Sequence, residues 1–193
     1  PQGGPKLTED EIAAIKRWID EGAADWKPSS SEPHRFISND DVVNAIEQDL
    51  ASSGTETSRP FFRYFILTNL YNAGDTKLAT YRSALSKLIN SLSWDRDIIL
   101  PTIIDKEQTI LRIDLREYAW SDPARTWNTI LEGYPYGVEL SGSAYARIQA
   151  MTSSRVPLIR AVWFLAAAAM PPLYHEVLEL PSNEEDLETC GRS

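Results

Sequence analysis

Cysteine and histidine are scarce in this chain of 193 residues. Cys190 is the only cysteine, and His34 and His175 are the only histidines. One cysteine excludes an internal disulfide and any CxxC or CxxCH motif. Because protein metal sites usually draw several ligands from cysteine and histidine, this chain alone cannot form a His-rich metal or catalytic cluster.

Positive charge is also in short supply. The formal net charge is −9 and the isoelectric point is near 4.8. Proteins that bind nucleic acids present basic stripes that displace counterions from phosphates, and this sequence has no such stripe. We therefore expect no nucleic-acid partner.

Long apolar runs are missing as well. The most apolar stretch, AVWFLAAAAMPPL from Ala161, is too short to cross a bilayer and ends in two prolines. It predicts a buried helix rather than a membrane span. The N-terminus has no charged start followed by an apolar stretch, so no targeting segment is visible. Because the sequence opens on Pro1 and stops at GRS, we expect it to be a piece of a longer protein.

The motifs of several common enzyme classes are absent. The sequence contains no P-loop and no GxGxxG, which would cradle phosphates. It also has no GxSxG elbow and no histidine placed to activate a serine. Nucleotide binding and hydrolysis by a serine nucleophile therefore have no support.

The stretch LTEDEIAAIKRWIDEGAADW, residues 7–26, has the pattern of a complete amphipathic helix. Thr8 and Glu11 have the spacing of a capping box, and Gly22 is placed to end the helix. The predicted apolar face consists of Ile12, Ile15, Trp18 and Ile19. This face needs a packing partner, which four upstream residues cannot supply.

The segment that follows, KPSSSEPH, is rich in Pro and Ser and has no apolar periodicity. This composition is typical of an interdomain linker. We therefore divide the chain into residues 1–26, a linker at 27–35 and a larger module at 36–193. We expect that module to continue beyond the end of the chain.

Most apolar residues of the larger module recur at helical spacing. Ser38 is a candidate N-cap for a helix with a buried stripe at Val42, Val43, Ile46 and Leu50. Further helices are predicted over residues 60–73, 75–94, 123–133, 141–154, 159–170 and 171–180. The period changes to two in TILRIDLR, residues 109–116, which predicts a β-hairpin around the DKEQ turn. The expected fold is mainly α (α+β), with one small β-hairpin.

Arg112, Asp114 and Arg116 are candidates for a polar site. Their spacing of two places them on one face of the predicted strand, with charges of alternating sign. Such a row forms either a structural ion-pair network or the lining of a polar cleft beside Trp120. The other acidic clusters lie at predicted helix starts, where they stabilise the helix dipole, so no metal site is predicted.

Met170 and His175 are a second candidate set. His and Met are the usual axial ligands of c-type haem, and these two lie beside two prolines. The alternative is a partly buried His at a helix start, with Met170 filling the core. Ligands this close in sequence rarely reach opposite faces of one macrocycle, which favours the structural alternative.

Tyrosines adjoin turn residues in two places, YPYG at 134–137 and NLYNAG at 69–74. Tyrosine has an apolar ring and a polar hydroxyl, so such tyrosines form either a binding surface or ordinary turn packing. The sequence leaves both alternatives open.

Trp18, Ile19, Asp20, Gly22 and Ala23 spell Trp-Ile-Asp-x-Gly-Ala at the end of the first helix. With the preceding turn PQGGPK, this arrangement resembles the end of a planctomycete-type cytochrome c domain, where the turn follows an axial Met-Pro. In that family the helix packs against the helix that carries CxxCH. Because the chain contains neither CxxCH nor that Met, the resemblance implies that haem c is attached upstream.

The remaining sequence, from FISNDDVV through RYFILTNLYNAG to AMPPLYHEVLELP, is similar to the segment that follows such a domain in large exported bacterial proteins. The resemblance implies a periplasmic or cell-surface haem protein. It assigns no activity to the larger module.

Three functions are therefore considered. The first is a fragment of a multidomain c-type cytochrome in electron transfer, whose partners are its upstream cytochrome domain and a redox protein. The second is an oxidoreductase whose pocket is lined by Arg112, Asp114, Arg116 and His175. The third is a non-catalytic module that binds or attaches to a partner or surface. A cleft that contains those four residues favours the second function, and dispersed positions together with a flat aromatic surface favour the third.

Overall fold

The computed structural model describes residues 8–20, 35–120, 122–137 and 140–180. The chain divides into two compact units, Pro1–His34 and Arg35–Ser193, a boundary that lies inside the predicted linker. In the first unit α1 (Glu9–Asp20) forms where a helix is predicted, and the Ile12 N–H donates to the Thr8 carbonyl at 3.0 Å. The predicted helix end at Gly22 lies outside the described residues.

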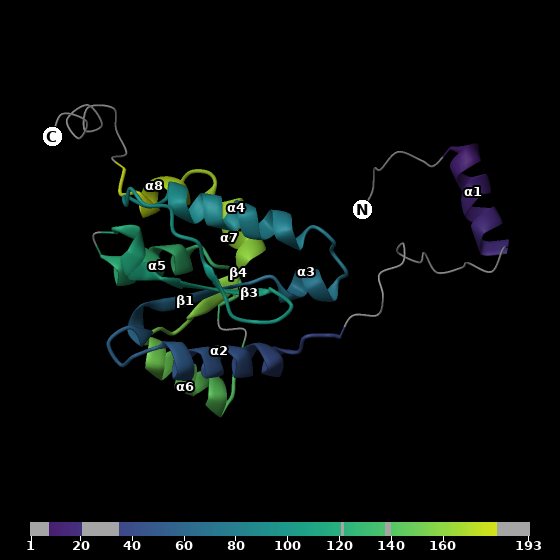
Figure 1. Ribbon diagram of the computed structural model, residues 1–193. Coiled ribbons are helices and arrows are strands. Elements are labelled where there is room, and N and C mark those ends of the chain that lie inside the picture. The colour runs from purple at the N-terminus through teal and green to yellow at the C-terminus, as the bar shows by residue number, and fades with distance from the viewer. Residues whose placement is uncertain (1–7, 21–34, 121, 138–139, 181–193) are drawn as a thin grey trace. The chain divides into compact units, whose positions relative to one another are not determined.

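Within the described residues, the second unit is built around a four-stranded sheet with the order β2-β3-β1-β4 (Figure 1). Its strands are β1 (Phe62–Ile66), β2 (Thr102–Ile103), β3 (Ile110–Asp114) and β4 (Leu158–Arg160). Strand β1 is antiparallel to β3 and parallel to β4. The predicted hairpin is confirmed as β2 and β3, and it forms one edge of a larger sheet.

Helices cover both faces of this sheet (Figure 1). One face carries α2 (Asn39–Ser53) and α6 (Ser143–Thr152). The opposite face carries α4 (Leu78–Ser91), α5 (Pro123–Glu132), α7 (Ala161–Ala168) and α8 (Leu173–Val177). The short α3 (Thr68–Asn72) follows β1, and the 3₁₀ helices η1 (Arg59–Phe61) and η2 (Leu115–Tyr118) flank β1 and β3. The prediction of a mainly α, α+β fold is confirmed.

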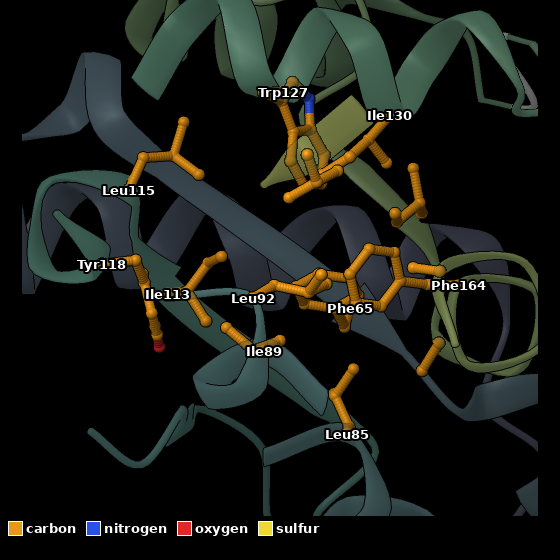
Figure 2. Close-up of a cluster of buried hydrophobic side chains, with 14 of the residues drawn as sticks. Phe65, Leu85, Ile89, Leu92, Ile113, Leu115, Tyr118, Trp127, Ile130 and Phe164 are labelled. Atoms are coloured by element: carbon orange, nitrogen blue, oxygen red, sulfur yellow. The ribbon is translucent and has the colours of Figure 1, made fainter. Parts of the chain in front are cut away.

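The larger core lies between the sheet and α4, α5, α7 and α8 (Figure 2). Phe65 of β1 packs edge-on against Trp127, with 5.9 Å between the ring centroids. It also packs against the tilted ring of Phe164, at a centroid distance of 4.9 Å. Trp127 is fully buried, and its indole N–H donates to the Val156 carbonyl at 2.9 Å. Aromatic packing over a large apolar area therefore stabilises this face.

The second core lies between the sheet and α2 and α6. The predicted helix stripe is confirmed, because Val42, Val43, Ile46 and Leu50 are all buried. Ser38 caps α2 as predicted and forms a capping box with Asp41. Side chains of β1 alternate between the cores, since Tyr64 faces this one and Phe65 the other.

Two predicted helices are wrong at their N-terminal ends. Residues 60–73 form η1, then β1, and only then a helix, α3. Residues 158–160 likewise form β4 before α7 begins. A strand that is buried on both faces is apolar on every side, as a buried central helix is, so periodicity alone does not distinguish them.

The apolar run from Ala161 forms α7, which is 8 residues long. Ala161, Phe164 and Ala168 are its buried positions, so it is only partly enclosed. In the described part of the chain, no helix combines the length and apolar character needed to cross a membrane.

Candidate functional site

The structure separates the four residues of the predicted oxidoreductase pocket. Arg112 lies in β3 and forms an ion pair with Asp49 of α2. Asp114 and Arg116 pair with each other at the end of the same strand. His175 is exposed on α8, which covers the opposite face of the sheet. The predicted three-residue network is thus split in two, and His175 belongs to neither part.

Arg112 belongs to a buried network with Asp49 and Tyr64. Its Nη1 donates to Asp49 Oδ1 at 2.6 Å, and the Tyr64 hydroxyl donates to Asp49 Oδ2 at 2.8 Å. Asp49 is 9% exposed and Tyr64 is 0% exposed. Burial, reinforced by the Asp49 carboxylate, raises the pKa of Tyr64. The three side chains satisfy one another inside the core, so their geometry is that of a structural network.

Asp114 and Arg116 lie where β3 passes into η2. Arg116 Nε donates to Asp114 Oδ1 at 2.9 Å, and its guanidinium lies 4.9 Å from the Phe61 ring centroid. The hydrogen bond to Asp114 raises the pKa of Arg116. Asp114 also accepts the Arg116 backbone N–H at 3.1 Å, which caps η2. This pair therefore fixes the end of the strand.

The predicted haem ligands both lie at the surface. Met170 is 63% exposed after α7, so it does not fill the core, and His175 is exposed on α8. Axial ligands must approach the iron from opposite sides within a pocket that encloses the macrocycle, which this exposed pair does not provide. These residues therefore do not fit a haem. Among the described residues, no three or more His, Cys, Asp or Glu side chains are placed to hold a metal ion.

A polar cleft of about 460 Å³ opens at the carboxyl ends of the parallel strands β1 and β4. Ile66 and Arg160 end these strands opposite one another. The rim comes from the start of α2 and from α3, and includes Phe36, Asn39, Asp40, Thr68 and Asn69. Ligand sites in open α/β sheets favour this location because the loops and helix starts that follow parallel strands converge there.

Hydrogen bonds fix one wall of this cleft. Asn72 of α3 accepts the Ile37 N–H at 2.9 Å and donates to the Ile37 carbonyl at 2.8 Å. The capping box of Ser38 and Asp41 adds further bonds, and the Ser38 hydroxyl and backbone N–H, which both donate to the Asp41 carboxylate, lower the pKa of that carboxyl. The segment before α2 is thereby held against α3, with Phe36 left 68% exposed.

Arg160 contributes to another part of the cleft wall. Its guanidinium lies 4.2 Å from the Tyr136 ring centroid, and its backbone N–H donates to the Tyr134 hydroxyl at 3.2 Å. The YPYG turn therefore lies beside the end of β4. NLYNAG supplies Asn69 and Asn72 to the same cleft. The two tyrosine-containing turns that the sequence singles out thus lie at one end of the sheet.

The side chains of the cleft are suited to binding a polar ligand. Its described lining has one carboxylate, Asp40, and one guanidinium, Arg160, and the other side chains are amide, hydroxyl or apolar. Nucleophilic catalysis needs a nucleophile beside a general base. The described lining offers the hydroxyls of Ser38 and Thr68 and the carboxylate of Asp40, and the Ser38 hydroxyl already donates to Asp41 at 2.7 Å. The arrangement can hold and orient a polar ligand.

Most residues of this cleft are not found by sequence reasoning. The sequence predicts that Asp40 stabilises a helix dipole and that Arg160 begins a buried helix. Only NLYNAG, as tyrosine beside turn residues, gives a signal. The pairing of β1 with β4 brings together residues 36–40, 66–72 and 160. No local spacing in the sequence indicates that pairing.

Comparisons of the chain with protein-family models, curated proteins and solved structures returned no match. The geometry of the cleft and the resemblance carried by residues 1–26 therefore indicate the function. The cleft lies in the second unit of the chain, and residues 1–26 lie in the first.

Proposed function

We propose that the chain is part of a multidomain c-type cytochrome, in which residues 35–180 form an accessory module that binds a small ligand without transforming it. The observation that carries the binding role is the cleft at the ends of β1 and β4, which is polar and balanced in charge. The Ser38 hydroxyl in that lining donates to Asp41 as part of the cap of α2. Small-molecule sites are typically clefts of this size with a few convergent polar groups.

The dispersal of the four candidate residues supports binding over catalysis. The oxidoreductase hypothesis places Arg112, Asp114, Arg116 and His175 around one substrate. Arg112 instead pairs with Asp49 inside the core, and His175 lies on a helix of the opposite layer. A non-catalytic role requires no such convergence.

The cytochrome part of the proposal rests on the Trp-Ile-Asp-x-Gly-Ala sequence and on the helix that precedes it. Helix α1 forms over Glu9–Asp20, and Ile12 on its predicted apolar face is 41% exposed. An apolar face of this kind is stabilised by packing against another helix. In the proposal that partner is an upstream domain that carries haem c and exchanges electrons with a redox protein, in the periplasm or at the cell surface.

The visible absorption spectrum tests the cytochrome part. The natural full-length protein, produced in an exporting host with haem maturation, is compared with the 193-residue chain. We expect a covalent c-type spectrum from the full-length protein alone. Haem bound by the short chain and lost in Met170→Leu would contradict an upstream site, and no haem in either form would contradict the cytochrome assignment.

A further inference from the structure

We propose that the cleft at the carboxyl ends of β1 and β4 binds a neutral polyhydroxylated ligand, either a monosaccharide or the end of an oligosaccharide. This inference rests on the binding role proposed above and names the ligand class. It follows from three properties of the cleft: its charge, its hydrogen-bonding groups and its exposed aromatic ring.

The charge of the cleft favours a neutral ligand. Asp40 and Arg160 carry opposite charges and are the ionisable side chains of its described lining. Asp41, at the start of α2 next to the cleft, is paired with Arg35 and adds no net charge. Asp40 offsets the positive end of the α2 dipole and repels an anion, while Arg160 repels a cation.

The polar groups suit hydroxyl groups on a ligand. The amides of Asn39 and Asn69 each offer donors and an acceptor, the Asp40 carboxylate accepts, and the Thr68 hydroxyl does both. Sugar hydroxyls also donate and accept, so neighbouring hydroxyls can pair with one amide or carboxylate. Asn39, Asp40 and Asn69 are exposed at the rim, and Thr68 is 8% exposed.

Phe36 provides the apolar contact. Its side chain is 68% exposed at the edge of the cleft, although the adjoining residues are fixed by Asn72 and the capping box. The face of a sugar ring that carries C–H groups can cover such a ring and remove apolar surface from water. Because the segment is already held in place, binding orders little of the backbone.

The test is a titration of the isotopically labelled 193-residue chain, followed by the NMR shifts of its backbone amides. The probes are glucose, galactose, N-acetylglucosamine and cellobiose. We expect saturable shifts confined to residues 36–40, 66–72 and 160. Saturation by a monosaccharide indicates recognition of a single ring, and saturation by cellobiose alone indicates the end of a longer chain.

Two variants and a matched control locate the binding. Phe36→Ala and Asn69→Ala remove exposed side chains, and we expect each to weaken binding by about tenfold or more. Trp94→Ala removes an aromatic side chain that is 60% exposed outside the cleft, and we expect unchanged binding. An unchanged amide spectrum away from each substitution shows that the variants fold.

Three outcomes overturn the ligand class: no sugar shifts these amides, the shifts lie elsewhere, or both cleft variants bind like the original chain. Inorganic phosphate and glycine serve as charged probes. If either saturates the cleft while sugars do not, the binding module stands and the sugar assignment fails. If no probe binds and the full-length protein has a c-type spectrum, the binding role fails while the cytochrome assignment stands.

Discussion

Arg63 and Arg112 lie on neighbouring strands and on opposite faces of the sheet, where Arg63 is buried and Arg112 is partly buried. Arg112 pairs with the Asp49 carboxylate at 2.6 Å. Arg63 is only 3% exposed, and no carboxylate pairs with it in the described part of the chain. Its guanidinium lies 5.6 Å from the centroid of the Trp127 ring.

Backbone carbonyls take the place of a carboxylate at Arg63. Its Nη1 donates to the carbonyl oxygens of Pro60, Phe62 and Thr152 at 2.9, 2.7 and 3.2 Å. Burial lowers the pKa of Arg63 to about 10. The guanidinium therefore remains charged at neutral pH without an acidic partner.

This comparison shows where the stability of each face resides. The α4, α5, α7 and α8 face depends on apolar area and aromatic packing, and its buried cation uses groups that folding already provides. The α2 and α6 face has a smaller core and a polar network that is satisfied only when all three members are present. Substitutions on the two faces should therefore act by different mechanisms.

The largest expected effect is on the apolar face. Trp127→Ala removes a fully buried indole that packs on Phe65, and leaves a cavity. We expect a loss of about 4 kcal/mol in the free energy of unfolding. Chemical denaturation of the 193-residue chain measures it. A loss below about 1 kcal/mol would mean that this core does not support the fold as the packing indicates.

The next effect is on the polar face. Asp49→Ala leaves the Arg112 guanidinium in the core without its carboxylate, and we expect a loss of about 3 kcal/mol. The double variant Asp49→Leu with Arg112→Met should recover part of that loss, because it leaves no uncompensated charge, although the Tyr64 hydroxyl loses its acceptor. Denaturation of the single variants Asp49→Leu and Arg112→Met and of the double variant measures the coupling. Additive losses would show that the two side chains do not interact.

The buried tyrosines make stability depend on alkaline pH. Burial raises the pKa of Tyr64 on one face and of Tyr118 on the other, so both keep their protons in the folded chain when tyrosines of the unfolded chain ionise. Their contribution is fully present below pH 10, the ordinary tyrosine pKa, and is lost as the pH rises above it. Each lost proton lowers the free energy of unfolding by about 1.4 kcal/mol per pH unit.

Denaturation between about pH 9 and pH 11.5 tests this slope. The lowered pKa of Arg63 acts in the opposite direction, since the folded chain releases that proton first. Because two tyrosines lower the free energy of unfolding as the pH rises and one arginine increases it, we expect a net decrease. Tyr64→Phe and Tyr118→Phe should each make the decrease shallower, and an unchanged slope in both would contradict the assignment.

At neutral pH the same two substitutions should have different effects on the free energy of unfolding. The Tyr64 hydroxyl donates to Asp49 at 2.8 Å, so Tyr64→Phe should cost about 1 kcal/mol. The Tyr118 hydroxyl is buried with no hydrogen-bond partner among the described residues. Tyr118→Phe removes that unsatisfied group and should be neutral or stabilising. Equal losses of stability in the two variants would contradict the difference in hydrogen bonding between the two hydroxyls.

The smallest effect concerns the ion pair of Glu47 and Arg147, which links the outer surfaces of α2 and α6. The Arg147 side chain is 56% exposed, so water and salt screen the pair. We expect Arg147→Ala to leave the denaturation midpoint unchanged within error. Comparison of Arg147→Ala with Asp49→Ala tests whether loss of an ion pair on the α2 face costs stability only when the pair is buried.

The accuracy of sequence reasoning differs between kinds of element. The helix with the Ser38 cap and the helix predicted over residues 75–94 are amphipathic, and both form, the second as α4 over Leu78–Ser91. The segments that became β1 and β4 have no polar side, so periodicity carries no information about them. The interpretation of Arg112, Asp114 and Arg116 as one row fails for a related reason. Strand alternation fixes the face of the sheet and says nothing of Asp49, which arrives from a distant helix.

The sequence by itself determined the helical caps, the amphipathic helices, the hairpin and the mainly α character of the fold. These features depend on residues within a few positions of one another, whose spacing is fixed by helix and strand geometry. Only the tertiary structure decided that β1 is central, that Asp49 receives Arg112, and that Phe36, Asn69 and Arg160 share a cleft. Each of these depends on contacts between distant segments, which form only when burial of the two cores brings the segments together.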